Sequence, residues 1–224
     1  MSLQVTLLEL RNRTLLRADM VNSTFRDSAE GGEVDDVINA EWRKAYRLLV
    51  AADDDYNLSS EDITTTQGTS VYALPSTFYK LKGLDAFPNG TTGDAQRVPK
   101  FRWDERNRYA TASGWTTFGP SAYRLRGSNL VLYPTPPAGI TLRAWYHPAP
   151  VNMADDADTI DIVTGIDELI VVGAAKTLLL EEGDIEAAAA LNGEYQALAQ
   201  QVMADVQGRS EPEQAADVIR EGFW

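Results

Sequence analysis

Apolar residues from Val34 to Leu49 recur at the spacing of a helix with one buried face. They stand at positions 34, 37, 38, 42, 45, 46, 48 and 49, close to the i, i+3, i+4 repeat. The pattern predicts a helix that ends near the acidic run 53–55, because negative charge at a helix C-terminus opposes the helix dipole. Leucines at 7, 8, 10, 15 and 16 predict a shorter amphipathic helix over 3–18.

Helical spacing returns in the last third of the chain. One apolar stripe predicts a helix over 166–181 that Gly183 ends, and Asp184 is a suitable N-cap for the next helix. Because its composition is rich in alanine, that next helix is predicted to continue until Gly208 closes it.

Between about 60 and 150, β-branched and aromatic residues are punctuated by Gly, Pro and Asn, which is typical of short strands and turns. The pattern predicts a hairpin around Gln67-Gly68, a strand over 78–87 and a hairpin that turns at 127–129. Residues 99–110 fit either a helical turn or a loop. Alternation over 130–145 puts apolar groups on both faces, which predicts a sheet packed on two sides.

Helices, then strands, then helices predict an α+β fold: a helical bundle formed by the N- and C-terminal helices, with an inserted antiparallel β-rich lobe. The predicted core is 1–58 with 151–207, and the predicted lobe is 59–150. The polar segment 208–224 is predicted as an extended tail. It either becomes ordered on binding a partner or is a disordered segment without a binding role. Its candidate apolar anchors are Val218, Ile219, Phe223 and Trp224.

Charge and cysteine content exclude several classes of protein. Twenty basic against 33 acidic residues give a net charge of -13, which repels phosphates and argues against a sequence-reading DNA-binding protein. The absence of cysteine excludes disulfides, zinc–thiolate sites and cysteine nucleophiles, and it is compatible with a reducing cytosol. Charged residues interrupt the apolar runs, so neither a signal peptide nor a membrane span is expected.

Candidate catalytic groups are few. His147 is the only histidine, and without a G-x-S-x-G motif we expect it to be a half-exposed structural imidazole at a strand end. The carboxylate runs 53–56 and 154–161 could bind calcium or hydrolyse a glycoside. Because neither run has EF-hand spacing, solvated loop charge is the favoured interpretation. No nucleotide-binding glycine loop is found in the sequence, and we expect neither a metal nor a cofactor.

Aromatic residues spread through the predicted lobe could line a carbohydrate-binding face. Core and interface packing is the commoner use of such residues, because large rings dominate both. They are Tyr72, Phe78, Tyr79, Phe101, Trp103, Trp115, Phe118, Tyr123, Tyr133, Trp145 and Tyr146.

Three segments together resemble the head-to-tail adaptor proteins of tailed bacteriophages, also called head-completion or connector proteins. They are "TFRDSAEGGEVDDVINAEWRKAYRLL", "SVYALPSTFYKLKGLDA", and "YRLRGSNLVLYPTPPAGITLRAWYHPAP" followed by "LIVVGAAKTLLLEEGDIEAAA". The first is similar to the family's opening helix and the second to its tyrosine-x-leucine-proline strand. The resemblance rests on order and spacing and covers most of 24–207. Residues 1–20 and the C-terminal tail show no family pattern.

The resemblance implies a structural protein rather than an enzyme. Family members form a ring, usually of twelve copies, beneath the portal of the filled head, where it extends the DNA channel and docks the tail or a stopper. The implied partners are the portal protein, a tail-side neck, stopper or tail protein, and further copies of the chain. Genomic DNA passes without sequence-specific binding. The implied place is the virion neck, after synthesis in the host cytoplasm and without contact to a membrane.

The resemblance also implies that the C-terminal segment reaches the portal, for which Val218, Ile219, Phe223 and Trp224 are the candidate contacts. Two other functions stay open. A carbohydrate-binding or glycan-hydrolysing virion protein would use the aromatic residues and carboxylates of the lobe. A soluble bacterial assembly factor would stay monomeric even with portal rings present. In isolation we expect a monomer, because the chain spares few apolar patches for an obligate interface.

Overall fold

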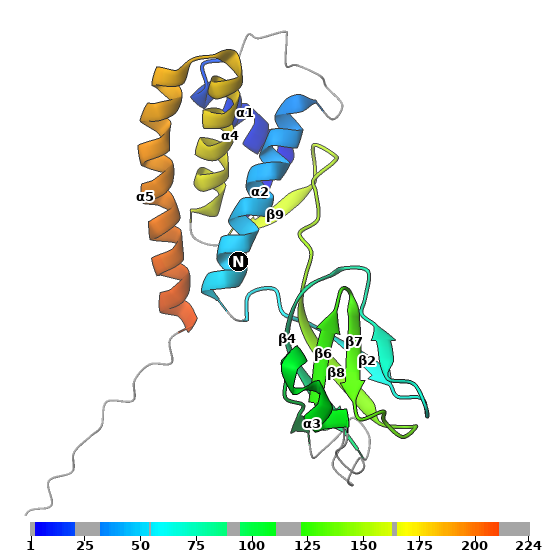
Figure 1. Ribbon diagram of the computed structural model, residues 1–224. Helices are drawn as coiled ribbons and strands as arrows, with labels where there is room; N and C mark the ends of the chain where they lie inside the picture. The colour runs from blue at the N-terminus through cyan, green and yellow to red at the C-terminus, as the bar shows by residue number, and fades with distance from the viewer. Residues whose placement is uncertain are drawn as a thin grey trace, which may run out of the picture. The chain divides into compact units, whose positions relative to one another are not determined.

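The computed structural model describes residues 3–20, 32–53, 55–88, 95–110, 122–162 and 165–210. These residues form helices and antiparallel sheets, which confirms the predicted α+β class. The chain divides into two compact units, here called the helical unit (1–55 with 150–224) and the β unit (56–149), as the colours of Figure 1 allow the reader to follow. The functional domains assigned from the sequence stay a prediction.

The helical unit is built around one apolar helix. Its described elements are β1 (Leu3–Thr6), α1 (Leu7–Arg17), α2 (Glu33–Ala52), β9 (Thr159–Ile162), α4 (Ile166–Glu182) and α5 (Ile185–Ser210). Helix α4 packs against α1, α2 and α5. Its buried residues lie all around the helix, including the continuous run 169–175, which is typical of a helix enclosed by others. The predicted helices over α2 and α4 are confirmed.

The start of the chain differs from the prediction. The helix expected over 3–18 begins only at Leu7, because Leu3–Thr6 form strand β1 and pair antiparallel with β9. Thr6 ends the strand and caps the helix, since its hydroxyl oxygen accepts a hydrogen bond from the backbone N–H of Glu9 at 3.2 Å. Strand β9 had no counterpart in the sequence prediction.

The turn between α4 and α5 agrees with the sequence, whereas the end of α5 does not. Gly183 has a left-handed backbone (φ 86°) and ends α4. The carboxylate of Asp184 accepts a hydrogen bond from the N–H of Ala187 at 3.0 Å, which confirms the predicted N-cap. Helix α5 continues through Ser210, so the predicted end at Gly208 is wrong. A glycine costs an exposed helix only about 1 kcal/mol, which does not force an end.

The β unit contains two antiparallel sheets, of strand order β2-β8-β4-β5 and β3-β7-β6. Its elements are β2 (Ser59–Thr64), β3 (Val71–Ala73), β4 (Phe78–Phe87), β5 (Gln96–Arg97), the 3-10 turn η1 (Trp103–Glu105), α3 (Arg106–Ala110), β6 (Ala122–Arg126), β7 (Asn129–Tyr133) and β8 (Thr141–Pro148). One hydrophobic cluster joins the sheets, with Leu84 and Leu142 from the first and Leu130 and Leu132 from the second. The unit is therefore a small two-sheet structure around one core.

Of the two predicted hairpins, one is confirmed and one is wrong. Strands β6 and β7 pair across a turn at Gly127, whose φ of 62° suits glycine. The chain also turns at Gln67-Gly68, where the N–H of Thr69 donates to the carbonyl of Thr66 at 3.1 Å. However, β2 pairs with β8 and β3 pairs with β7, so this turn carries the chain from one sheet to the other.

The two faces of β8 are held by different interactions. Leu142 and Ala144 are buried in the shared core. On the other face, the guanidinium of Arg143 donates two hydrogen bonds to Asp62, at 2.7 and 2.8 Å, and lowers the pKa of that carboxyl. The indole N–H of Trp145 donates to Asp85 at 2.8 Å. The outer face is therefore stabilised by polar pairs, whereas the inner face is held by apolar packing.

Candidate interaction surfaces

His147 is part of the core of the β unit and not half-exposed, so that expectation is wrong. Its side chain is fully buried, and its Nδ1 donates to the backbone carbonyl of Tyr56 at 2.8 Å. Its Nε2 has no hydrogen-bond partner among the described residues. The imidazole thus joins the first residue of the β unit to its last strand, which is a structural role.

The acidic run 154–161 supports the start of α1. The carboxylate of Asp158 accepts hydrogen bonds from the N–H groups of Asp155 and Ala154, at 3.0 and 2.7 Å, which hold the pKa of Asp158 below its usual value. The backbone carbonyl of Asp158 accepts the N–H of Leu7 at 2.9 Å. This loop therefore satisfies a backbone group that every helix leaves open at its N-terminus.

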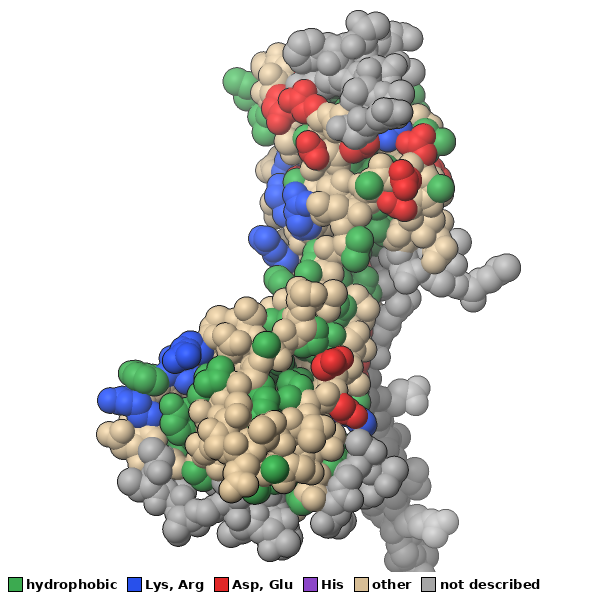
Figure 2. Space-filling view, turned by 90° about the vertical axis from the view of Figure 1, so that its right-hand side faces the viewer, with side chains coloured by type: hydrophobic (Ala, Val, Ile, Leu, Met, Phe, Trp, Pro, Cys, Tyr) green, Lys and Arg blue, Asp and Glu red, His purple; other side chains and the backbone are tan. Residues whose placement is uncertain are grey.

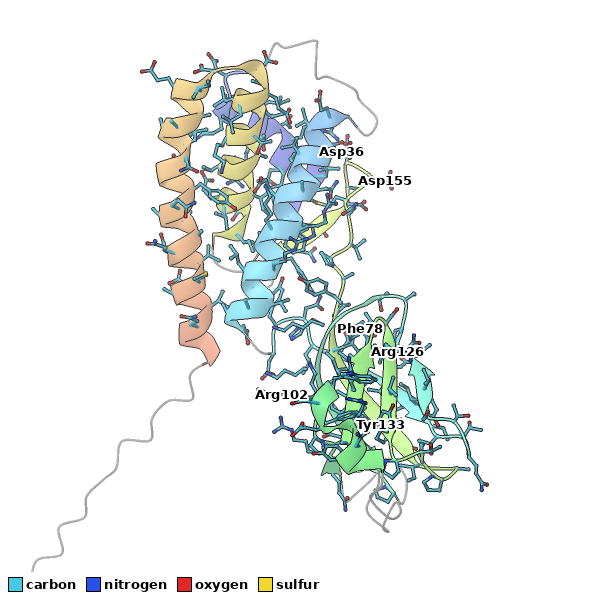
Figure 3. The ribbon with its side chains drawn as sticks, viewed as in Figure 1. Asp36, Phe78, Arg102, Arg126, Tyr133 and Asp155 are labelled. Atoms are coloured by element: carbon cyan, nitrogen blue, oxygen red, sulfur yellow. The ribbon has the colours of Figure 1, made fainter. Side chains whose placement is uncertain are left out.

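Arg11 connects the same loop to α2. Its guanidinium donates to both carboxylate oxygens of Asp35, at 2.8 and 2.7 Å, and lies 2.9 Å from Asp156. The side chain of Asp35 is only 5% exposed. These hydrogen bonds raise the pKa of Arg11 despite its burial. Figure 3 shows the neighbouring residues Asp36 and Asp155 in the same part of the helical unit.

The two acidic runs do not assemble a metal site in the part of the chain that the structure describes. There, no group of three or more His, Asp or Glu side chains is arranged to hold an ion. The carboxylate of Asp53 accepts a hydrogen bond from the N–H of Asp55 at 2.9 Å. Within 154–161, Asp156 and Asp158 are engaged by Arg11 and by backbone N–H groups. The described carboxylates Asp53, Asp156 and Asp158 thus hold loop segments in place.

A buried carboxylate lies where α2, α4 and α5 meet. Glu41 is buried, and its Oε1 accepts a hydrogen bond from the ammonium of Lys44 at 2.6 Å. Burial raises the pKa of Tyr195 on α5, and the charge of Glu41 raises it further. A Cβ atom at Gly173 would lie 2.7 Å from Glu41 Oε2 and 2.9 Å from the ring of Tyr195. The glycine therefore makes room for this cluster.

The β unit carries a pocket that combines arginines with aromatic rings, which we call the basic–aromatic pocket. It has a volume of about 290 Å³ and is lined by Trp103, Arg124, Arg126, Val131 and Tyr133. Trp103 is 57% exposed. The guanidinium carbons of Arg106 and Arg124 lie 4.6 and 4.4 Å from the centre of its indole ring, within the range of a cation–π interaction. Figure 3 labels Arg126, Tyr133 and the nearby Arg102.

Packed aromatic rings support this pocket from below. Phe101 is buried and contacts Tyr133 edge to face, with ring centres 5.2 Å apart. It also contacts Tyr109 on α3 at 5.2 Å. Such support keeps an exposed site in shape, so that less ordering entropy is lost when a partner binds.

The other sequence candidates have several locations. Of the aromatic candidates, Tyr123 and Tyr146 are buried like Phe101, whereas Tyr79 is exposed like Trp103. The rings thus do not form one open face. Trp115 and Phe118 lie outside the described residues, as do Val218, Ile219, Phe223 and Trp224.

The net charge is divided unequally between the units. Residues 56–149 contain ten Lys and Arg against six Asp and Glu, a net charge of +4, whereas the rest of the chain contains ten against 27, a net charge of -17. Figure 2 shows both carboxylates and basic side chains on the helical unit, and basic side chains beside hydrophobic ones along an edge of the β unit. The net charge of the whole chain conceals this division, which a count for each predicted domain reveals.

A family model described as SU10 adaptor protein matches residues 5–220. The chain belongs to this family of phage head-to-tail adaptors. The resemblance noted from the sequence is thereby confirmed, but the match also includes residues 5–20 and 208–220, so the expectation of no family pattern there is wrong. A search of the curated proteins finds no match. Membership supports a structural adaptor role in a virion, with interactions to portal and tail components. Among the described helices of the adaptor, none is long and apolar enough to cross a membrane.

Proposed function

We propose that the adaptor assembles as a ring beneath the portal, in the copy number of twelve that is usual for the family. The ring would extend the DNA channel and dock the tail or a stopper. Family membership over residues 5–220 is the observation that carries this proposal. Genomic DNA would pass through the ring without sequence-specific binding.

The division of charge supports a channel through which DNA slides. A surface rich in carboxylates repels phosphates, whereas a basic one holds them. We therefore propose that the helical unit, with a net charge of -17, supplies the channel lining. The basic β unit would then contact proteins instead of DNA.

The C-terminal segment 211–224 is our proposed contact with the portal. It is mostly polar, with Val218, Ile219, Phe223 and Trp224 as apolar anchors. Segments of this composition commonly order on a partner, and aromatic residues contribute strongly to such interfaces. The segment begins directly after Ser210, where the described helix α5 ends.

Removal of residues 211–224 tests the proposal. The truncated adaptor should keep its thermal unfolding midpoint, because the deletion leaves α5 intact, and it should no longer co-sediment with portal rings of the same phage. The full-length double variant Phe223→Ala, Trp224→Ala should give the same loss without a change of length. If both proteins co-sediment as well as the unaltered chain, the segment has no role in portal binding.

A second experiment tests the ring itself. Electron microscopy of virions should place twelve copies of the adaptor at the neck. The adaptor purified alone is expected to be a monomer. Labelled adaptor located at the tail tip or on the capsid surface would exclude the proposed position.

A further inference from the structure

The turn between α4 and α5 is an exposed surface with both apolar and acidic side chains. Every residue from 180 to 186 is exposed, including Leu180 at 51% and Ile185 at 71%. The acidic residues of this segment are Glu181, Glu182, Asp184 and Glu186. We call residues 180–186 the acidic turn. The helical unit has other exposed apolar side chains, among them Leu16 at 71%, but here two of them stand beside four acidic residues in one short segment.

The basic–aromatic pocket of the β unit has the complementary properties. Its arginines present planar guanidinium groups, which pair with carboxylates through two parallel hydrogen bonds. Val131 and the ring of Tyr133 give it an apolar lining. A volume of about 290 Å³ is near the lower end of ligand-sized cavities, at about 300 Å³. The pocket therefore suits one or two aliphatic side chains with carboxylates beside them.

A nucleic acid fits the pocket less well. Base stacking needs an open aromatic face, and the guanidinium groups of Arg106 and Arg124 already lie over the indole of Trp103. A phosphate backbone could pair with the arginines but has no aliphatic group to occupy the apolar part. Tryptophan, tyrosine and arginine together are instead the residues that dominate protein–protein contacts.

We propose that the basic–aromatic pocket of one adaptor copy receives the acidic turn of a second copy. The net charges of +4 and -17 on the two units favour such an encounter between copies. The contact joins two different surfaces of identical chains, so it is heterologous and can close into a ring. The inference rests on the proposed ring and names two surfaces that would form its subunit contacts.

The chain lacks cysteine, so single engineered thiols can be cross-linked without background. Val71 is 39% exposed and pairs with Val131 across β3 and β7, beside the pocket. Ala189 is exposed one turn beyond the acidic turn. A mixture of the full-length variants Val71→Cys and Ala189→Cys, treated with a short bismaleimide at high protein concentration, should give a covalent heterodimer. High concentration traps a contact that is weak at dilution.

The matched control replaces Ala189→Cys by Gln207→Cys. Gln207 is exposed on the same face of α5, 18 residues and about 27 Å farther along the helix. We expect about tenfold less heterodimer with this control, which corresponds to a difference of about 1.4 kcal/mol. Equal yields from the two mixtures would overturn the proposal.

Charge reversal tests the chemistry of the contact. Arg126→Glu in the Val71→Cys chain and Glu186→Arg in the Ala189→Cys chain should each lower the yield about tenfold. Together they should restore part of it, because the two charges are exchanged. The proposal is overturned if each single variant lowers the heterodimer yield, the pair does not recover it, and both proteins keep their thermal unfolding midpoint. That result would exclude pairing between Arg126 and Glu186.

Two further measurements separate other occupants. One chain that carries both Val71→Cys and Ala189→Cys should form cross-links between different chains. If all cross-links form within single chains, the pocket binds the acidic turn of its own chain. If the adaptor retains a fluorescent DNA oligonucleotide at physiological salt and Arg126→Glu removes this binding without changing cross-linking, the pocket is a nucleic-acid site. Either result overturns the proposal. Portal co-sedimentation is measured separately, so failure here does not decide the adaptor role.

Discussion

Arg11 joins three segments of the helical unit through a single side chain. It extends from α1, pairs with both oxygens of Asp35 on α2 and contacts Asp156 in the loop before β9. The buried carboxylate of Asp35 would be costly without this partner, because burial removes the water that otherwise stabilises its charge.

Replacing Arg11 by methionine should therefore destabilise the protein strongly. Arg11→Met is expected to lower the free energy of unfolding by about 3 kcal/mol, as for other buried pairs that lose one partner, measured by urea denaturation. Arg17→Met on the same helix is the control, since its partner Glu194 and Arg17 itself are both well exposed; its effect should stay below about 1 kcal/mol. Similar losses in the two variants would contradict the role assigned to burial.

Asp158 gives a prediction for pH. Because backbone N–H groups lower its pKa below the usual 3.8, the folded loop favours the charged carboxylate. Its stabilising effect is present above pH 3.8 and is lost as the pH falls through the lower folded pKa. Asp158→Asn should thus lower the thermal unfolding midpoint at neutral pH, and the difference from the unaltered protein should narrow below pH 3.8.

The control for this pH experiment is Asp155→Asn. Asp155 donates its backbone N–H to Asp158, a contact that the substitution keeps. A midpoint shift of equal size in both variants, or one for Asp158→Asn that does not change with pH, would contradict the explanation by charge.

At the level of elements, two glycines in the helical unit have opposite uses. Gly173 lies on α4, where an added Cβ would meet Glu41 and Tyr195 at 2.7 and 2.9 Å. Gly193 lies on α5, where nothing stands within 4 Å of such an atom. The first glycine permits close packing of helices, whereas the second only weakens its helix.

The same substitution should therefore have opposite effects at the two sites. Gly173→Ala is expected to lower the free energy of unfolding by about 2 kcal/mol, as overpacking does. Gly193→Ala is expected to raise it by about 0.5–1 kcal/mol, because alanine is the better helix former. Both values come from chemical denaturation. A stabilising Gly173→Ala would show that the cluster around Glu41 adapts at no cost.

Elements with strong local patterns could be predicted from the sequence, and pairings between distant segments could not. The helices α2 and α4, the strand β4 and the β6–β7 hairpin follow from spacing and turn residues. The β1–β9 ladder pairs Val5 with Ile160. The local pattern of apolar residues does not specify which distant strand will pair. The turn at Gln67-Gly68 has hairpin chemistry, yet its two strands belong to different sheets.

For the candidate sites too, local patterns could be predicted from the sequence, whereas contacts between distant residues could not. The absence of catalytic motifs could be read from the sequence, but the burial of His147 could not, because a single histidine has no pattern. The basic–aromatic pocket gathers Trp103 on η1, Arg124 on β6 and Tyr133 on β7. Only pairing between β6 and β7 and the packing of Phe101 bring these groups together.

For the molecule as a whole, the β unit is an insertion that begins and ends at one place. The chain enters it at Tyr56 and leaves it at Ala149. The 2.8 Å hydrogen bond from His147 to the carbonyl of Tyr56 links the entering segment to the leaving one. Beyond it, the β2–β8 ladder starts with Ser59 opposite Tyr146.

This arrangement determines how the β unit responds to tension. Strands β2 and β8 are antiparallel, and both connections lie at the same end of their ladder. A force that pulls the connections apart therefore acts perpendicular to the strands. It loads the hydrogen bonds one pair at a time, starting at the end near His147. Strands loaded in this way unzip at lower force than strands that must slide. Single-molecule stretching between residues 55 and 150 should therefore open the β unit in small successive steps, and one abrupt high-force event would contradict it. Under load, the hydrogen bond from the only histidine of the chain to Tyr56 would be among the first contacts between the entering and the leaving segment to yield.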